Sequence, residues 1–367
     1  MESFQKGKAG TLDKQVPRVV VITGGSSGIG RCTASLFARQ GWSVGLIARG
    51  GEGLAASCAD IEASGAAAAA VRADVTNSIA LGDAATAIVA LLGPIDVWIN
   101  CAGNGVYGRF GDVPVAEFQR VTDVTYHGTV NGTRVALAHM RQRGHGSIVN
   151  VCSAAAFHGL PLMSSYAGAK AAVRAFGQAI RGELKIERSP IRVTTVYPPA
   201  VNTPFFSRAV SHMGWPARPL WPVYQPEVVA QGIWQAVVSG RPEMPISGTA
   251  ALFSLASRIT PALIGWCMGR LGFERQSNRD QSARELHDPT LFEASERVFG
   301  VHGSFGKWAK GWSSHLWLVR AITMTAQPFY FLRRRRPKLP EIASPPTHAP
   351  PEKDPGLGGL AAQPADS

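Results

Sequence analysis

The phenol of Tyr166 and the amine of Lys170 stand four positions apart in the segment YAGAK. Residues with this spacing share one face of a helix, so the two groups would lie one turn apart. A free tyrosine has a pKa of about 10, and a neighbouring ammonium group stabilises the phenolate and lowers that pKa. The pair is therefore a candidate for general acid/base chemistry, although pairs with this spacing are also common on helix surfaces.

A second candidate is the glycine-rich segment TGGSSGIG, which spans Thr23 to Gly30. It follows a β-branched apolar run and precedes a predicted helix. Glycines permit a tight turn and a close approach of the backbone to a pyrophosphate, and the helix N-terminus offers free N–H groups to the anion. The segment predicts a dinucleotide site, against the alternative of an ordinary strand-to-helix turn.

Regular elements must position these candidates, and the sequence alternates short apolar segments with longer helical ones. Such segments suit strands that are buried on both faces of a parallel sheet. The alternation predicts an α/β fold with a doubly wound, Rossmann-like parallel sheet of about seven strands. The predicted strands are Val16–Gly24, Ser43–Ala48, Ala70–Asp74, Ile95–Asn100, Ser147–Cys152, Ile191–Tyr197 and Met244–Ser247. The predicted helices are Gly28–Gln40, Glu52–Ser64, Ser78–Leu92, Val115–Arg143, Ser164–Arg188 and Pro226–Ser239.

The pattern changes near residue 250 and predicts four regions. Residues 1–16 are expected to be a flexible lead, and residues 17–249 a nucleotide-binding catalytic domain. Residues 250–335 are expected to form a helical, partly amphipathic C-terminal extension. The Pro-, Ala- and Gly-rich residues 336–367 have few large apolar side chains and predict a disordered tail.

Charge and cysteine content narrow the class of protein. The 37 Lys and Arg exceed the 25 Asp and Glu, with a basic run at 333–336, which suits an anionic cofactor, anionic lipid or nucleic acid. Nucleic acid is disfavoured because no recognition fold accompanies the run. Five scattered cysteines without metal-ligand spacing predict reduced thiols, no metal site and a cytoplasmic location. We expect no secretory leader and no spanning helix.

Over residues 17–249 the sequence resembles the short-chain dehydrogenase/reductase family. The glycine segment matches the family motif TGxxxGxG, and Asn100–Gly103 is similar to its NNAG motif. Ser153, thirteen positions before Tyr166, completes the order and spacing of the family's Ser, Tyr and Lys. The resemblance implies that Ser153 holds the substrate oxygen, Tyr166 is the acid/base, and Lys170 binds the nicotinamide ribose and tunes Tyr166.

The resemblance also implies a set of cofactor contacts. Asp74 would contact the adenine, and Val201 and Thr203 the nicotinamide carboxamide. The full implied set is Thr23, Gly24, Ser26, Ser27, Gly28, Ile29, Gly30, Arg49, Asp74, Val75, Asn100, Ala102, Gly103, Tyr166, Lys170, Val201 and Thr203.

The position after the second predicted strand indicates which dinucleotide binds. NAD-using members of the family carry an acid there, whereas this chain has Ala48 followed by Arg49. A guanidinium can pair with a 2′-phosphate, so NADP(H) is favoured over NAD(H). The alternative is that Arg49 is a solvated loop residue.

Two departures from the family pattern affect the site. Thr125 stands where the family has an Asn that holds a water in the proton relay to Lys, so the sequence does not decide whether this relay is present. The nearby His127 is interpreted as a packed or rim residue. Pro199 stands where Gly is usual and predicts a stiffer loop. The following segment, with Phe205, Phe206, Met213, Trp215 and Trp221, indicates either an apolar substrate or ordinary packing.

The resulting hypothesis is an oxidoreductase that moves a hydride between NADP(H) and a small-molecule carbonyl or alcohol, expected to be apolar, with Tyr166 as the general acid/base. The alternative is an NADP(H)-binding sensor or scaffold without turnover, motivated by Thr125. For the extension, residues 308–338 suggest peripheral membrane contact through Trp side chains and the arginine run; the alternative is that its helices cover the cleft or a partner. We also expect a homo-oligomer.

Overall fold

The computed structural model describes residues 18–331 except 273, 281–283, 286 and 296. The predicted flexible lead, the arginine run at 333–336 and the predicted disordered tail lie outside the described residues. The chain divides into two units, Met1–Met324 and Thr325–Ser367; of the second, only the end of helix α12 is described.

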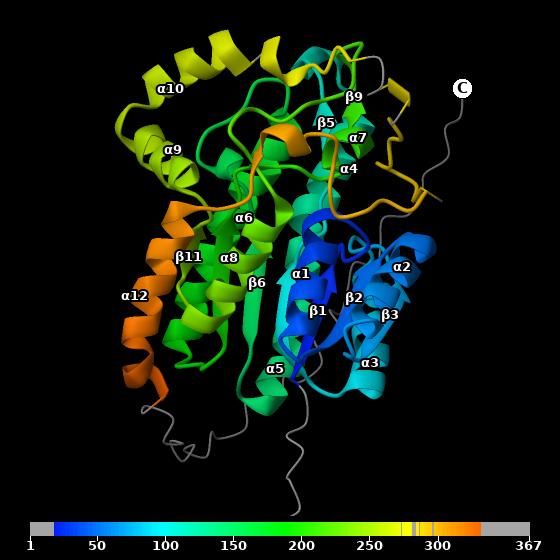
Figure 1. Cartoon of the computed structure of the whole chain (residues 1–367), viewed down its shortest axis with the longest axis vertical. Helices are drawn as coiled ribbons and strands as arrows, with labels where there is room; N and C mark the ends of the chain where they lie inside the picture. The colour runs from blue at the N-terminus through cyan, green and yellow to red at the C-terminus, as the bar shows by residue number, and fades with distance from the viewer. Residues whose placement is uncertain (1–17, 273, 281–283, 286, 296, 332–367) are drawn as a thin grey trace, which may run out of the picture. The chain divides into compact units, whose positions relative to one another are not determined.

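A seven-stranded, fully parallel sheet forms the centre of the first unit, in the order β11-β7-β6-β4-β1-β2-β3 (Figure 1). The order reverses direction at β1, so the sheet is doubly wound as predicted, and the carboxyl ends of β1 and β4 meet at the switch point. The strands are β1 Val19–Thr23, β2 Ser43–Ala48, β3 Ala68–Arg72, β4 Ile95–Asn100, β6 Ser147–Val151, β7 Arg192–Tyr197 and β11 Glu243–Pro245.

Two helical layers cover the sheet because its strands are apolar on both faces. One buried cluster joins Phe37, Leu54 and Ile233 of three helices on one face, and another joins Ile88 and Met140 on the other. The helices of the first face are α1 Gly28–Arg39, α2 Gly51–Glu62 and α8 Pro226–Ser239. Those of the second are α3 Ser78–Leu92, α5 Gly128–Arg143 and α6 Ser164–Ile186.

Several predicted elements have different limits in the structure. Strand β3 begins and ends two residues earlier than predicted, and β11 is shifted by one residue or more. The helix predicted over Val115–Arg143 is α4 Val115–Thr122, a π-helical turn at Asp123–His127, and α5. A π-helical turn adds a residue to one helical turn, which the apolar pattern alone does not reveal.

Short elements around the carboxyl edge of the sheet carry the loops of the site. Strands β5 (Val106–Tyr107) and β9 (Val210–Ser211) pair with each other, and β8 (Ala200–Val201), β10 (Val223–Tyr224) and β12 (Ala309–Lys310) form a third sheet. Helix α7, Phe205–Arg208, lies between β8 and β9.

The C-terminal extension is only partly helical. Helix α9, Gly248–Ile259, is capped by the Ser247 hydroxyl, which accepts a hydrogen bond from the Ala250 amide at 3.1 Å. Pro261 then starts α10, Pro261–Cys267, because proline cannot continue the preceding helix. Helix α12 covers Ser314–Phe331.

Between these helices, residues 288–303, here called the strap, contain no helix or strand among their described residues. The strap crosses the carboxyl edge of the sheet near β1 and β2. The predicted helical extension is therefore confirmed in α9, α10 and α12. The prediction is wrong for the strap, because the strap is held by hydrogen bonds to the rest of the first unit rather than by an apolar helical face.

Candidate functional site

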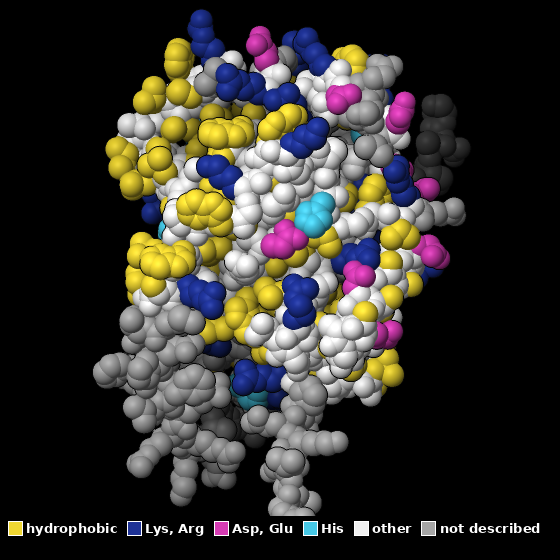
Figure 2. All heavy atoms as spheres, viewed as in Figure 1, with side chains coloured by type: hydrophobic (Ala, Val, Ile, Leu, Met, Phe, Trp, Pro, Cys, Tyr) yellow, Lys and Arg dark blue, Asp and Glu magenta, His cyan; other side chains and the backbone are white. Residues whose placement is uncertain are grey.

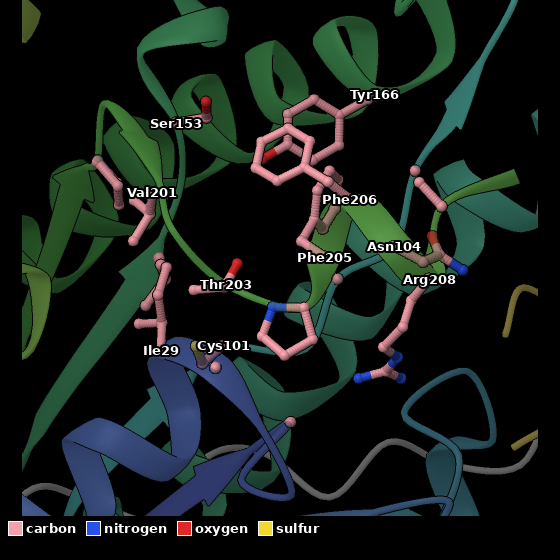
Figure 3. Close-up of a pocket in the computed structure, with 18 of the residues that line it drawn as sticks. Ile29, Cys101, Asn104, Ser153, Tyr166, Val201, Thr203, Phe205, Phe206 and Arg208 are labelled. Atoms are coloured by element: carbon pink, nitrogen blue, oxygen red, sulfur yellow. The ribbon is translucent and has the colours of Figure 1, made fainter. Parts of the chain in front are cut away.

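A cavity of about 500 Å³ lies at the carboxyl edge of the sheet, where parallel α/β folds bind their ligands (Figure 3). Its walls come from the glycine turn after β1, the loops after β2, β4, β6 and β7, the start of α6 and the extension. The cavity holds most of the predicted site residues: Gly24, Ser26, Ser27, Gly28, Ile29, Gly30, Arg49, Asp74, Val75, Ala102, Gly103, Ser153, Tyr166, Lys170, Val201 and Thr203.

The glycine turn has a conformation that other residues would strain. Gly24 and Gly28 have positive φ angles of 71° and 53°, and a Cβ on Gly30 would lie 2.2 Å from the Gly24 carbonyl oxygen. The first turn of α1 can therefore pack directly onto the strand end, which places the N-terminus of the helix at the cavity.

Thr23 and Asn100, both predicted to contact the cofactor, do not line the cavity. The Thr23 hydroxyl accepts hydrogen bonds from the Cys101 and Ala102 amides at 3.2 and 3.3 Å. The Asn100 amide donates to Thr133 and Asn150 at 3.0 and 2.9 Å. These two side chains hold the strand ends and loops in place around the cavity.

Ser153, Tyr166 and Lys170 come together at one end of the cavity. Ser153 follows β6, and its hydroxyl accepts a hydrogen bond from the Ala155 amide at 3.1 Å. Tyr166 and Lys170 lie on α6, one turn apart, and the Lys170 Nζ is 5.6 Å from the centre of the Tyr166 ring. The buried Lys170 ammonium donates a hydrogen bond to the Val151 carbonyl oxygen at 2.8 Å.

The local electrostatics favour the neutral phenol. Burial raises the pKa of Tyr166 well above its ordinary value, against a smaller lowering by a hydrogen bond with Ser153. Burial also lowers the pKa of Lys170. The sequence predicted a lowered pKa for Tyr166, and the difference arises because removal of the phenolate from water outweighs the nearby favourable contacts.

Asp74, predicted to contact the adenine, lines the cavity but is paired with Arg120 of α4. The Asp74 Oδ1 also accepts hydrogen bonds from the amide and hydroxyl of Thr76, each at 2.9 Å. Although burial opposes it, these bonds lower the pKa of Asp74 below its ordinary value. The carboxylate is thus fixed in position at the wall of the cavity.

Arg49 is neither solvated nor free to turn. Its Nη1 donates to the carbonyl oxygen of Phe292 at 2.5 Å and its Nη2 to that of Thr290 at 2.5 Å, with a longer contact to Leu291 at 3.3 Å. The residue expected to bind a 2′-phosphate therefore also holds the strap. The interpretation of Arg49 as a solvated loop residue is wrong, because these carbonyls desolvate its guanidinium.

Sequence reasoning missed Arg208, which lies in the same part of the cavity. The Arg208 guanidinium donates to the Ser27 hydroxyl of the glycine turn at 2.7 Å and to the Thr290 hydroxyl of the strap at 3.0 Å. Burial, together with the charge of Arg49, lowers the pKa of Arg208 to about 10. Two mutually repelling guanidinium groups beside a glycine turn make this end of the cavity suited to phosphate.

Thr125 and His127 lie on the π-helical turn and do not line the cavity. The Thr125 hydroxyl is fully buried and has no hydrogen-bond partner among the described residues. His127 is exposed and pairs with Asp123 at 2.9 Å.

Another part of the cavity wall is apolar. Phe205, Phe206 and Trp221 line it as the lid segment suggested, whereas Met213 packs in a neighbouring cluster and Trp215 lies under the Arg284 guanidinium at 3.9 Å. The centres of the Phe205 and Tyr166 rings lie 5.6 Å apart. Sequence reasoning missed several apolar wall residues, namely Leu160, Met163, Leu220, Phe253 and Met268.

A protein-family model, curated proteins and solved structures all relate this chain to dehydrogenases and oxidoreductases. The family model for short chain dehydrogenases matches residues 18–214. The uncharacterized oxidoreductase YxnA of Bacillus subtilis (strain 168) is 32% identical over 304 residues, which cover 82% of this chain and 83% of that protein. That match is longer than residues 1–249, so it includes part of the extension.

Two further proteins are similar over about two thirds of this chain. The 3-ketodihydrosphingosine reductase of Bos taurus is 32% identical over 229 residues, covering 60% of this chain and 68% of that protein. The crystal structure of a short chain dehydrogenase/reductase from Burkholderia phymatum in complex with NAD has a TM-score of 0.61 and 23% identity, covering 67% of this chain and 95% of that chain. This structural likeness confirms the predicted fold class.

Removal of the Arg49 guanidinium should loosen the strap, because charge-assisted hydrogen bonds contribute about 1.5–3 kcal/mol each. In Arg49→Ala we expect the amides of residues 290–300 to exchange with solvent deuterium about tenfold faster or more. Arg141→Ala, which removes an exposed ion pair with Glu187, is the matched control. Unchanged protection of the strap in Arg49→Ala would show that other contacts hold it.

Proposed function

From the premise that this chain belongs to the short-chain dehydrogenase family and is an NAD(P)-dependent oxidoreductase, we propose a more specific activity. The protein moves a hydride between NADP(H) and the carbonyl or hydroxyl carbon of an apolar substrate, with Tyr166 as the general acid/base. The observation that carries this proposal is that Ser153, Tyr166 and Lys170 line the same cavity as the glycine turn.

Each of the three side chains has a role that its surroundings support. The Ser153 hydroxyl, fixed by the Ala155 amide, hydrogen-bonds the substrate oxygen. The neutral Tyr166 phenol donates its proton to that oxygen during reduction and accepts it back during oxidation. Lys170 binds the nicotinamide ribose and supports the tyrosinate that reduction leaves behind. When bound, NADPH supplies the hydride that balances this proton.

The residues of the cavity fit a phosphorylated dinucleotide. The space that a Cβ on Gly24 or Gly30 would occupy is filled by neighbouring backbone, so the turn keeps its amides close to the ligand. Ala48 and Arg49 leave the ribose position without an acid. The guanidinium groups of Arg49 and Arg208 add positive charge there, which supports NADP(H) over NAD(H).

An apolar substrate is supported by the aromatic and aliphatic wall beyond Tyr166, formed in part by Phe205, Phe253 and Met268. One similar protein is named as a reductase of 3-ketodihydrosphingosine, which agrees with a ketone at the reacting carbon. Homo-oligomerisation and a cytoplasmic location stay predictions.

A second candidate function is cofactor sensing without turnover. The buried Thr125 hydroxyl, which has no partner among the described residues, stands where the family has the Asn of the proton relay. If the relay is broken, the site binds cofactor but cannot exchange the proton of Tyr166 repeatedly with solvent. Turnover measurements separate the two functions.

Tyr166→Phe removes the acidic hydroxyl and leaves the ring that packs against Phe205. We expect kcat/KM for a panel of apolar ketones to fall by about 10²–10⁴-fold, with NADPH affinity, measured by fluorescence titration, nearly unchanged. Tyr126→Phe, on the π-helical turn, is the matched control. Equal inactivity of the parent chain and Tyr166→Phe, with NADPH bound by both, would instead support the sensor.

The direction of the pKa shift predicts different pH profiles for the two reaction directions. Reduction uses the protonated phenol, and because burial raises the pKa of Tyr166, the rate of reduction should be level through neutral pH. Oxidation uses the phenolate, so its rate should rise about tenfold per pH unit from pH ~7 to ~9. An oxidation rate that is already level at neutral pH would contradict a raised pKa in the complex.

Arg49→Ala tests the cofactor assignment. Because charge-assisted hydrogen bonds to phosphate are worth about 1.5–3 kcal/mol, the ratio of NADPH to NADH affinity should fall roughly ten- to a hundredfold. Arg49→Lys keeps the charge without the forked geometry, and its ratio should lie between the two. An unchanged ratio in Arg49→Ala would mean that this guanidinium serves the strap alone.

A further inference from the structure

Large apolar side chains lie exposed over the extension. Trp266 of α10 is 61% exposed, Trp317 of α12 is 72% exposed, and Trp221 at the cavity is 73% exposed. The exposed set, here called the apolar face, is Trp221, Leu252, Leu255, Ile259, Leu263, Trp266, Trp308, Trp312, Trp317, Leu318 and Ile322. Figure 2 shows hydrophobic side chains gathered over the part of the surface where α9, α10 and α12 lie in Figure 1.

The charge within this face has one sign. Residues 248–272 and 304–322 contain no Asp or Glu. They contain three arginines and two lysines, namely Arg258, Arg270, Arg320, Lys307 and Lys310. All five are exposed, and none takes part in an ion pair between described residues. Two of the cations lie over aromatic rings, Arg270 over Trp266 at 5.7 Å and Lys310 over Trp221 at 5.4 Å.

Helix α9 connects this face to the cavity. Thr249, Ala250 and Phe253 line the cavity from one side of the helix. Leu252, Leu255 and Ile259, at positions three and four apart, are exposed on another side. The helix is thus one wall of the cavity and also part of the apolar face.

The opening of the cavity lies within the same face. Trp221 lines the cavity and is also largely exposed, so it stands at the rim. Lys310, over the Trp221 ring, follows Trp308 by two residues. The apolar end of the cavity therefore meets solvent among side chains of the apolar face.

We propose that the apolar face docks on an anionic lipid bilayer, so that the substrate enters the cavity past Trp221 directly from the membrane. Apolar and tryptophan side chains enter the acyl and headgroup boundary, and the five cations lie against anionic headgroups. The substrate is then a membrane-resident lipid alcohol or ketone. This last part rests on the proposed function, whereas the docking itself does not.

The observations favour a bilayer over other occupants. A second copy of this chain would bring the same five cations against themselves, whereas an anionic surface complements them. No single described helix has the length and apolar content to cross a membrane, although α9 and the segment Pro261–Arg270 together do, with a bend of 120° between them. Because one side of α9 lines the cavity, the structure favours docking by the other side over spanning.

Flotation of the full chain with vesicles tests the docking without any requirement for turnover. We expect the chain to float with phosphatidylcholine vesicles that contain phosphatidylserine, and less with phosphatidylcholine alone. Leu255→Ser/Ile259→Ser/Leu263→Ser/Trp266→Ser should lower the partition coefficient by about tenfold or more. Arg258→Gln/Arg270→Gln should lower it only for the anionic vesicles.

The matched control is Ile79→Ser/Leu91→Ser, which removes apolar side chains that are 76% and 71% exposed on α3. This control should float like the parent chain. NADPH binding and thermal unfolding confirm that each variant is folded. The proposal is overturned if the fourfold variant floats as well as the parent chain does. It is also overturned if the parent chain does not float and the fourfold substitution instead disrupts its oligomeric state, because the apolar face would then bind a second copy.

Vesicles with brominated acyl chains test the position of the cavity mouth. Bromine quenches tryptophan fluorescence only at close range, so Trp221→Phe and Trp266→Phe should each reduce the quenched fraction. Trp98→Phe, in the buried centre of β4, should leave the quenched amplitude unchanged. Quenching that is insensitive to Trp221 would show that the mouth does not face the lipid, whatever the enzyme's activity.

Discussion

The close backbone approach between Gly30 and Gly24 is the constraint on which the rest of the site depends. With 2.2 Å between a hypothetical Cβ and the Gly24 carbonyl oxygen, only glycine lets α1 start directly above the end of β1. The turn then presents Ser27 to Arg208 and the Gly28 amide to the Gly300 carbonyl at 3.1 Å. Both the phosphate end of the cavity and the attachment of the strap are therefore built on the same turn.

The central sheet and the group Ser153, Tyr166 and Lys170 could be predicted from the sequence because their signals are local. A β-branched strand, a glycine turn and a four-residue spacing on a helix each depend on neighbours in the chain. The strap and Arg208 could not be predicted, because their contacts join residues that are far apart in the sequence. Arg49 meets the carbonyl oxygens of residues 290–292 across some 240 positions, and Arg208 meets Ser27 across 181. Backbone carbonyls carry no residue-specific signal, so no pattern in the sequence indicates this contact.

The two uses of Arg49 have a structural consequence. Its guanidinium donors are directed at strap carbonyls, while its position after β2 is the one that meets a 2′-phosphate in a family member that uses NADP. A phosphate is a stronger acceptor than a neutral carbonyl, so a phosphorylated cofactor bound as proposed would compete with the strap for the same donors. The attachment of the strap and the identity of the cofactor would then be coupled through one side chain.

The surroundings of Tyr166 link the chemistry to the extension. Burial keeps the phenol neutral, and the apolar wall that excludes water from this region includes Phe253 of α9. A helix that completes a dry cavity must hide one side from water, and the other side of α9 is apolar as well. Exposure of that second side costs free energy in water unless another apolar medium covers it. The extension that forms part of this wall therefore also carries the apolar face, and a membrane would cover that face in the docking proposed above.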